Sequence, residues 1–151
     1  MTTPQIPTNV PKWIQEHVKL YLADPEKGHM WDSTPLGGPG VLPALLLTMT
    51  GAKTGEKRIL PLIYQKVGDR FVIIGSKGGA PDHPLWYKNL VKTPACHIQV
   101  AADHYDCVAR TAEGAEREEL WAKMAEIYPP YNDYQESAGD RQIPVVVLDP
   151  V

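Results

Sequence analysis

Apolar residues recur at helical spacing near both ends of the chain. One stripe begins after Pro11, with Asn9 as a candidate cap, ends near Asp24, and contains Trp13, Ile14, Val18, Tyr21 and Leu22. The other stripe ends at Pro129 and contains Leu120, Trp121, Met124, Ile127 and Tyr128. Apolar side chains three or four positions apart share one helix face, so each stripe predicts an amphipathic helix. A shorter helix is predicted over residues 84–92, where Asp82 can cap the first turn and Pro84 presets φ.

Runs of aliphatic, β-branched and aromatic residues predict strands between these helices. The predicted strands cover residues 44–50, 57–66 with an interruption at Pro61, 70–75, 95–102, 105–111 and 143–148. A turn at residues 51–55 and another at Asp103-His104 would make two antiparallel hairpins. About six mostly antiparallel strands with about three helices indicate an α+β fold, and closure of the sheet into a small barrel would remove its edges.

Residues 28–40, with the sequence GHMWDSTPLGGPG, are dense in turn formers. We interpret this run as a linker between the first helix and the strands. The chain then consists of an N-terminal helix and linker, residues 1–40, and a barrel region, residues 41–151, within a single domain overall. A chain of 151 residues can bury a core of its own without a metal or disulfide to stabilise it.

The net charge and the cysteine content indicate which kinds of partner and which cellular compartment fit the sequence. Fifteen lysines and arginines against eighteen aspartates and glutamates give a formal net charge of -3, which argues against an extended nucleic-acid surface. Cys96 and Cys107, without C-x-x-C spacing, fit a reduced cytoplasmic protein. The longest apolar run is far shorter than the ~20 residues that span a bilayer. The apolar face of the first helix, with Trp13, leaves peripheral membrane contact as a hypothesis, which the balanced charges around it weaken.

Two glycine-bounded loops carry cationic residues in this acidic chain. The sequence GAKTGEKR places four polar residues within one turn: Lys53, Thr54, Lys57 and Arg58. The sequence GSKGG places Ser76 and Lys77 just before the predicted helix, where paired glycines allow close backbone approach and the helix start favours anions. An ordinary hairpin turn and a simple chain reversal are the respective alternatives. Two local cationic loops favour an anionic small molecule over a polymer.

The segment YPPYNDY is a third candidate, because Tyr128, Tyr131 and Tyr134 recur every three residues beyond a helix end. In a polyproline or 3₁₀ stretch this spacing aligns three phenols on one edge. Such an edge could cover a flat ligand and offer a proton. A loop that packs on the surface is the alternative.

The segment CHIQVAADHYDC contains four soft ligands, but their spacing matches no usual zinc finger or ribbon: Cys96, His97, His104 and Cys107. No metal site is therefore predicted. The G-x-S-x-G motif is absent, and the other histidines are interpreted as surface or helix-start residues: His17, His29 and His83. A chain with anion loops and an aromatic edge, but without an evident nucleophile or metal, fits a protein whose cofactor performs the chemistry.

Four stretches together resemble the deazaflavin-dependent nitroreductase family, which uses coenzyme F420. They are LLLTMTGAKTGEKRILPLIY, GSKGGAPDHPLWYKNL, the hairpin from ACHIQV to VARTA, and YPPYNDYQESAGDRQIPVVVLDP. The match runs in order from about Ala44 to the C-terminus, and the first forty residues correspond to the variable part of the family. The resemblance implies a split β-barrel related to that of FMN-binding oxidoreductases, in agreement with the barrel closure predicted above.

The resemblance also implies a set of site residues. Lys53 and Thr54 match the turn that holds the phosphate and acidic tail of the cofactor, although Ala52 stands where the family often has arginine. The remaining matches to cofactor-binding positions are Arg58, Ile59, Leu60, Pro61, Leu62, Ile63, Ile74, Gly75, Ser76, Lys77, Leu85, Trp86, Tyr87, Lys88, Asn89 and Tyr131. Substrate-side positions match Ser76, Tyr128, Tyr131 and Tyr134.

The function implied is hydride transfer from reduced F420 to an electron-poor acceptor, namely a quinone, an activated alkene (enone) or a nitroaromatic compound. Ser76 and Tyr131 are the predicted catalytic residues, as neutral donors that orient or protonate the acceptor. An FMN-dependent oxidoreductase of the same superfamily and a non-catalytic deazaflavin-binding or carrier protein are the alternatives. The oligomeric state and the natural acceptor stay open at this point.

Overall fold

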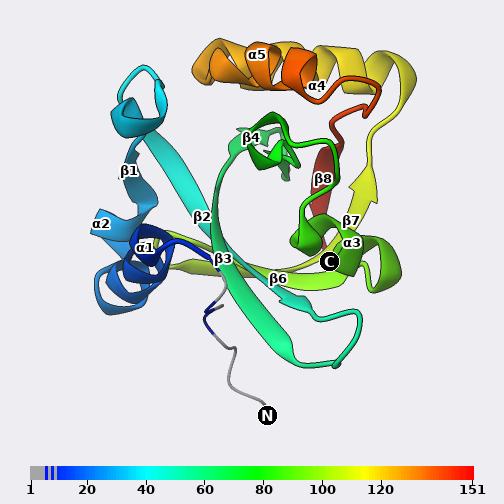
Figure 1. Ribbon diagram of the computed structural model, residues 1–151. Coiled ribbons are helices and arrows are strands. Elements are labelled where there is room, and N and C mark those ends of the chain that lie inside the picture. The colour runs from blue at the N-terminus through cyan, green and yellow to red at the C-terminus, as the bar shows by residue number, and fades with distance from the viewer. Residues whose placement is uncertain (1–5, 7, 9) are drawn as a thin grey trace.

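The computed structural model describes Ile6, Thr8 and residues 10–151. In this part of the chain one antiparallel sheet curls into a partial barrel, and helices cover its outside (Figure 1). The strands are β1 (Met30–Asp32), β2 (Val41–Thr50), β3 (Lys57–Ile63), β4 (Gln65–Val67), β5 (Arg70–Ile74), β6 (Ala95–Val100), β7 (Asp103–Thr111) and β8 (Val145–Pro150). The α-helices are α1 (Lys12–Ala23), α2 (Pro25–His29), α3 (Leu85–Lys92), α4 (Gly114–Ile127) and α5 (Pro130–Ser137), and the 3₁₀ turns are η1 (Thr34–Leu36) and η2 (Lys77–Gly79).

Strand β2 organises the sheet because it pairs with three other strands. It pairs with β1 at its start, with β3 along residues 44–50, and with β6 at residues 46–48, always antiparallel. The sheet then continues through β7, β8, β5 and β4 in that order. Strand β2 is covered on both faces, which explains why the run from Ala44 to Leu47 is uniformly apolar and buried. The predicted α+β split barrel is therefore confirmed.

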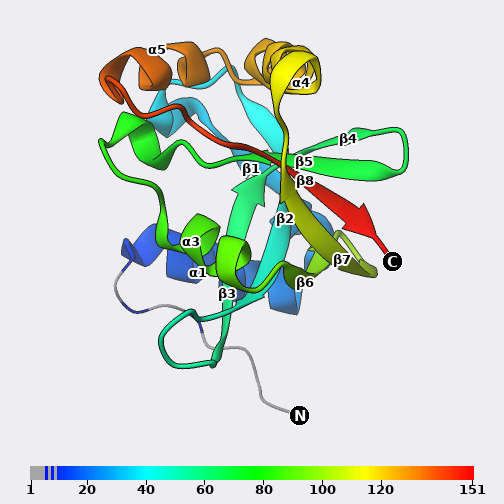
Figure 2. The same ribbon diagram turned by 90° about the vertical axis from the view of Figure 1, so that its right-hand side faces the viewer.

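Helices α4 and α5 lie side by side above one end of the curled sheet, while the β4–β5 hairpin projects to one side (Figure 2). The apolar stripe of α4 packs on this end, as its spacing predicted, with Leu120 and Met124 buried beside Val145 and Val147 of β8. A second cluster fills the barrel from Leu45, Phe71, Ile98 and other buried side chains of the sheet. The two clusters bury different faces of the same strands, since alternate side chains point to opposite sides.

The N-terminal segment is packed against the sheet over much of its described length. The Tyr21 hydroxyl of α1 donates to the carbonyl oxygen of Ala44 at 2.8 Å and accepts from the Ala101 amide at 2.8 Å. Gly28 lies against Tyr21 so closely that a Cβ atom at this position would overlap the Tyr21 backbone. Residues 28–40, interpreted above as a linker, contain β1 and η1, and Trp31 pairs with Leu42 of β2. A short strand, which pairs with the start of the next strand β2, therefore lies within this run of turn-forming residues.

Several local predictions were wrong. Five α-helices occur in the described residues instead of about three, because Pro25 and Pro130 each occupy the first turn of a further helix. Strand β3 is not interrupted at Pro61, which faces Leu46 in register; within the described residues β3 pairs with β2 alone, so a missing N–H is tolerated.

The β6–β7 turn lies at residues 101–102, just before the Asp103-His104 pair that was predicted to form it. Asp82 does not cap α3, whose N-cap is Pro84. The Asn9 cap lies outside the described residues.

Candidate functional site

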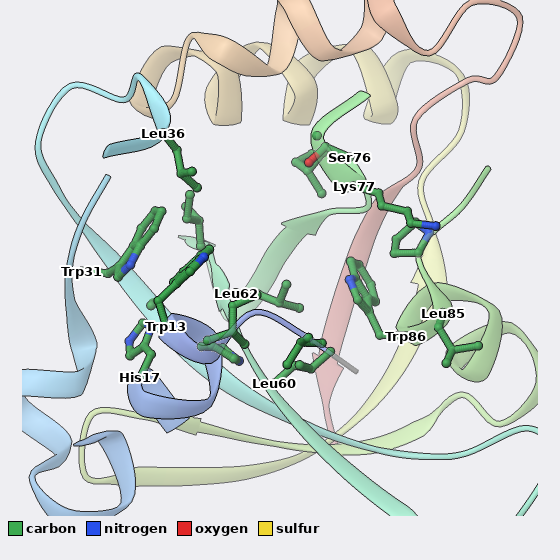
Figure 3. A pocket seen from close by; sticks show the side chains of 18 of the residues that line it. Trp13, His17, Trp31, Leu36, Leu60, Leu62, Ser76, Lys77, Leu85 and Trp86 are labelled. Atoms are coloured by element: carbon green, nitrogen blue, oxygen red, sulfur yellow. The ribbon is translucent and has the colours of Figure 1, made fainter. Parts of the chain in front are cut away.

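A cavity of about 860 Å³ lies between the sheet and the N-terminal segment, with α5 above it. Figure 3 shows two groups of side chains that face each other across this space. We call one group the sheet wall, formed by Leu60, Leu62, Ser76, Lys77, Leu85 and Trp86. The opposite group is the aromatic wall, formed by Trp13, His17, Trp31 and Leu36. Tyr128, Tyr131 and Tyr134 complete the lining as the tyrosine roof.

Strand β3 contributes part of the cavity lining. Leu60, Pro61, Leu62 and Ile63 line the cavity, together with Arg58 near the start of the strand, whereas Ile59 is buried with Val18. Arg58 also pairs with Glu56 at 3.2 Å. The strand therefore presents apolar side chains and one guanidinium to the same space.

The loop after β5 brings Ser76 and Lys77 to the cavity in an unusual backbone conformation. Lys77, Gly78 and Gly79 have φ angles of 48°, 62° and 84° in succession. A Cβ atom on Gly79 would lie 2.8 Å from the Tyr134 carbonyl oxygen, so the loop packs tightly against α5. The paired glycines thus allow the close backbone approach that the sequence motif predicted, and they also supply left-handed backbone.

Lys77 reaches Asp82 through a 3.0 Å ion pair at the rim of the cavity. The hydrogen bond and charge of Lys77 lower the pKa of the Asp82 carboxyl. Asp82 therefore orients this lysine instead of capping the helix. The side chain of Lys77 is 46% exposed, so its ammonium can also meet an anion that enters from solvent.

The turn at residues 51–56 is anchored to α3 through its backbone. Asn89, which is buried and lines the cavity, accepts a hydrogen bond from the Ala52 amide at 2.9 Å. The Lys92 ammonium donates to the Ala52 carbonyl oxygen at 2.6 Å. Lys53 and Thr54 are exposed on this turn, outside the cavity lining. The turn is therefore tied to the second half of α3.

The tyrosine roof differs from the predicted extended edge. Tyr131 and Tyr134 lie one turn apart in the α-helix α5, and Tyr128 precedes it. The Tyr128 and Tyr134 hydroxyls share a hydrogen bond of 2.8 Å, whereas the Tyr131 hydroxyl has no hydrogen-bond partner among the described residues. Tyr131 is only 4% exposed, and this burial raises the pKa of its phenol. Tyr131 therefore presents a protonated, unpartnered hydroxyl at the cavity.

Most of the predicted site residues converge on the cavity. They are Arg58, Leu60, Pro61, Leu62, Ile63, Ile74, Ser76, Lys77, Leu85, Trp86, Asn89, Tyr128, Tyr131 and Tyr134. Seven others do not line it: Ala52, Lys53, Thr54, Ile59, Gly75, Tyr87 and Lys88. Tyr87 points away, since its hydroxyl bonds to the Thr111 hydroxyl at 2.8 Å. Gly75 is buried against Pro144, which explains why it supports the loop without facing the space.

The sequence interpretation missed the aromatic wall. Trp13 was recognised only as part of a helical stripe, and Trp31 lay in a run dominated by turn formers. His17 was interpreted as a surface or helix-start residue, which was wrong: it is 9% exposed, and burial lowers its pKa. Two tryptophans and a histidine within one segment could have suggested an aromatic surface, but their convergence depends on the packing of α1 against β1.

Other classes of site find no support in the described residues. The part of the chain that the structure covers contains no group of three or more histidine, cysteine, aspartate or glutamate side chains arranged to hold a metal ion. Among the helices of residues 10–151, none is long and apolar enough to cross a membrane. The arrangement that remains is an apolar cleft with cations at its rim and hydroxyls above, which suits a flat anionic cofactor beside an uncharged acceptor.

Comparison with known proteins gives consistent results. The family model described as F420H(2)-dependent quinone reductase matches residues 15–150. An F420H(2)-dependent quinone reductase of Mycobacterium tuberculosis (strain ATCC 25618 / H37Rv) is 34% identical over 146 residues, which cover 93% of this chain and 97% of that protein. A solved F420-H2 dependent reductase superposes with a TM-score of 0.65 at 41% identity, covering 70% of this chain and 93% of that one.

A further solved structure, described as a domain-swapped dimer, superposes with a TM-score of 0.69 at 36% identity, covering 91% of this chain and 98% of that one. The family match thus extends from within helix α1 to strand β8 and includes His17, Trp31 and Leu36 of the aromatic wall, whereas Trp13 lies before its first residue. The chain belongs to the F420H(2)-dependent quinone reductase family.

Proposed function

We propose that this protein reduces a quinone with reduced coenzyme F420 in the cavity between the sheet wall and the tyrosine roof. The observation that carries the proposal is Tyr131, which lines the cavity, is 4% exposed as a residue, and has no hydrogen-bond partner for its hydroxyl among the described residues. Burial raises the pKa of this phenol, so its hydroxyl stays protonated and is available to donate to a ligand in the cavity.

The residues of the sheet wall fit a deazaflavin. Leu60, Leu62 and Trp86 offer apolar contact to a tricyclic ring, and Lys77 and Arg58 in the same lining can pair with an anionic tail. The volume of about 860 Å³ leaves room for a second planar molecule, since ligand cavities commonly measure roughly 300–1,000 Å³. When bound in reduced form, F420 supplies the hydride. The protein aligns the two rings and excludes water from the space between them.

Hydride addition to a quinone leaves negative charge on an oxygen atom, which a neutral donor can stabilise. The raised pKa of Tyr131 keeps its proton in place, so this phenol acts as a hydrogen-bond donor to the developing oxyanion. Ser76 lines the same cavity and is a second donor. A proton taken up from water completes the quinol. Enones and nitroaromatic compounds develop similar charge on oxygen and are further acceptors under this proposal.

The predicted membrane contact gains no support from the position of Trp13. This side chain lines the cavity and stacks on Trp31, with ring centroids 5.8 Å apart. Contacts within the protein therefore explain why one side of Trp13 is buried, and no membrane contact is needed for this.

An anaerobic assay tests the proposed reaction by following the oxidation of reduced F420 after a quinone is added. We expect Tyr131→Phe to lower kcat by about 100-fold, which is the lower end of the rate contribution of a positioned proton donor. The F420 dissociation constant should change less than about twofold. Tyr105→Phe, on β7 outside the cavity lining, is the matched control.

Titration with FMN and with F420 distinguishes the two cofactors. Tight F420 binding without oxidation by any quinone, enone or nitro compound would instead indicate a carrier protein.

A further inference from the structure

Arg141 lies in the segment between α5 and β8, outside the cavity lining, and its guanidinium reaches the loop that follows β5. Nε donates to the carbonyl oxygen of Ala80 at 2.9 Å, Nη1 to that of Gly75 at 3.0 Å, and Nη2 to that of Ser76 at 2.7 Å. These carbonyl groups lie at the start and at the end of the loop that carries Lys77. One planar side chain therefore bridges the whole loop.

A fourth contact of the guanidinium involves His83. Nη1 also donates to Nδ1 of this imidazole at 3.1 Å. Because a guanidinium can only donate, Nδ1 carries no proton, and the neutral ring holds its proton on Nε2. Burial and the charge of Arg141 lower the pKa of His83, in agreement with a neutral ring. The ring also packs edge-to-face on Tyr87 of α3, with 4.9 Å between ring centroids, so the acceptor is itself held in place.

The loop needs such contacts because its backbone conformation is unusual. Residues 77–79 have φ angles of 48°, 62° and 84° in succession, and the first of them, Lys77, has a side chain that disfavours this region. Within the loop, the Gly79 amide donates to the Ser76 carbonyl oxygen at 2.9 Å, and the Ala80 amide donates to that of Lys77 at 3.2 Å. These bonds shape the turn but do not fix its position in the protein. The guanidinium adds contacts from outside the loop.

The backbone of Arg141 is held by Gln135 of α5. The side-chain amide of Gln135 donates to the Arg141 carbonyl oxygen at 2.7 Å and accepts from the Ile143 amide at 2.9 Å. Gln135 follows Tyr131 by four residues and therefore belongs to the next turn of the same helix. The amide of Gln135 thus connects the helix of the tyrosine roof to the segment from which Arg141 reaches the loop.

We propose that Gln135 and Arg141 form a clamp that holds the Ser76 hydroxyl at a fixed position relative to the tyrosine roof. Both residues of the clamp lie outside the cavity lining, so they are positioning residues. The inference rests on the proposed function, in which the hydroxyls of Ser76 and Tyr131 donate to the oxyanion that hydride addition leaves on the quinone. A donor stabilises this charge fully only when it points to the place where the charge develops.

Arg141→Lys tests the clamp, because one ammonium cannot reproduce four donations in a plane. At saturating reduced F420 we expect kcat to fall about 10-fold and the quinone KM to stay within about twofold, since the hydroxyl is displaced while the apolar lining remains. Arg110→Lys is the matched control: its guanidinium also makes several donations, to Glu116 and Asp149, but it lies on β7 outside the cavity lining. An unchanged kcat in Arg141→Lys would overturn the proposal.

Gln135→Met tests the clamp from the side of the helix. Methionine has a similar volume and an unbranched chain, but it loses both hydrogen bonds with residues 141–143. We expect kcat to fall about fivefold, and the variant with both changes to fall by less than the product of the two single reductions, because the residues act as one unit. Fully multiplicative effects would show that Gln135 and Arg141 act independently and would refute the clamp.

A double-mutant cycle with Ser76 distinguishes positioning from general stability. Ser76→Ala removes the hydroxyl and should itself lower kcat about 10-fold, equivalent to about 1.4 kcal/mol. In this background Arg141→Lys should change kcat less than about twofold, because the group that it positions is absent. An arginine that only stabilises the fold would lower kcat equally in both backgrounds, and that result would overturn the assignment.

Hydrogen–deuterium exchange separates the clamp from the proposed reaction, since it requires neither cofactor nor quinone. Amides of residues 76–80 should exchange about fivefold faster in Arg141→Lys than in the wild-type protein, whereas Arg110→Lys should leave them unchanged. Faster loop exchange in a protein that reduces no quinone would support the clamp and contradict the proposed reaction. Unchanged loop exchange in Arg141→Lys would refute the clamp even if the wild-type protein reduces quinones.

Discussion

The two walls of the cavity are built in different ways. The sheet wall is held by strand pairing and hydrogen bonds: β3 pairs with β2 over seven positions, and Asn89, Lys77 and Arg141 tie the neighbouring loops. The aromatic wall is held by ring stacking and by the anchoring of one helix, in which Tyr21 and His17 provide the hydrogen bonds to distant backbone. One wall is polar at its rim, and the other is apolar.

This difference suggests that the two walls bind different ligands. The sheet wall is rigid and carries cations, which suits a ligand that is the same in every turnover; in this family that ligand is the F420 cofactor. An apolar wall binds an acceptor through the area it buries and through its shape, so acceptors of different structure can bind there. The comparison predicts that changes in one wall should leave the ligand of the other largely unaffected. Four experiments test this separation, beginning with the largest expected effect.

Gly28→Ala should disrupt the aromatic wall most strongly. The new methyl group would overlap the Tyr21 backbone, and overpacking of this kind typically costs about 1–3 kcal/mol, with the upper end expected here because backbone must move. Denaturant unfolding should report the loss, and the quinone KM should rise. Gly51→Ala in the sheet-wall turn is the control with a smaller expected loss, since its nearest neighbour is the Thr54 hydroxyl at 3.1 Å. A large change in the F420 affinity of Gly28→Ala would contradict the expected separation of the two walls.

Tyr21→Phe should have the next largest effect. It removes the hydroxyl that bonds to Ala44 and Ala101 and leaves a partly buried amide without its acceptor, at an expected cost of about 2 kcal/mol. The ring remains, so hydrophobic packing is preserved and the loss reports the hydrogen bonds. Urea unfolding of this variant beside Tyr105→Phe measures it. A loss equal to that of the control would show that α1 is held by packing alone.

Lys77→Ala tests the opposite wall. Its ammonium is half-exposed and already paired with Asp82, so we expect the F420 dissociation constant to rise only about fivefold at moderate salt. The quinone KM should stay within twofold. Lys66→Ala, on β4 away from the cavity, controls for the change in net charge. A larger effect on the quinone than on F420 would reverse the assignment of the two walls.

The smallest effect should be a pH dependence of stability that arises in the aromatic wall. Burial lowers the pKa of His17 below the usual value near 6.5, so at pH below about 6.5 the unfolded chain binds a proton that the folded state resists. Stability should therefore fall as pH decreases, with a limiting slope of about 1.4 kcal/mol per pH unit for one group. His17→Gln should reduce this slope without abolishing it, because the pKa of His83 is lowered as well. An unchanged slope from pH 5 to 7.5 would mean that His17 is not constrained as described.

Much of this architecture could be predicted from the sequence because its determinants are local. The stripe in α4, the apolar run of β2 and the GSKGG loop each depend on residues within a few positions of one another. The family resemblance added the cofactor and brought Ser76, Asn89 and Tyr131 into one site. Errors occurred where a partner outside the local pattern overrode the signal of that pattern. Asp82 is attracted by Lys77 instead of capping α3, and Trp31 joins β2 from within a run of turn formers.

The sequence by itself determined the class of fold, the glycine-bounded cationic loops and the cofactor family, since hydrophobic period, glycine placement and motif order are all readable along the chain. Only the tertiary structure decided that Trp13, His17 and Trp31 form one surface, that Arg141 holds the Ser76 loop, and that the Tyr131 hydroxyl has no hydrogen-bond partner among the described residues. These relations join residues up to 66 positions apart. They depend on how helices and loops pack on the curled sheet, and spacing along the chain does not encode that packing directly.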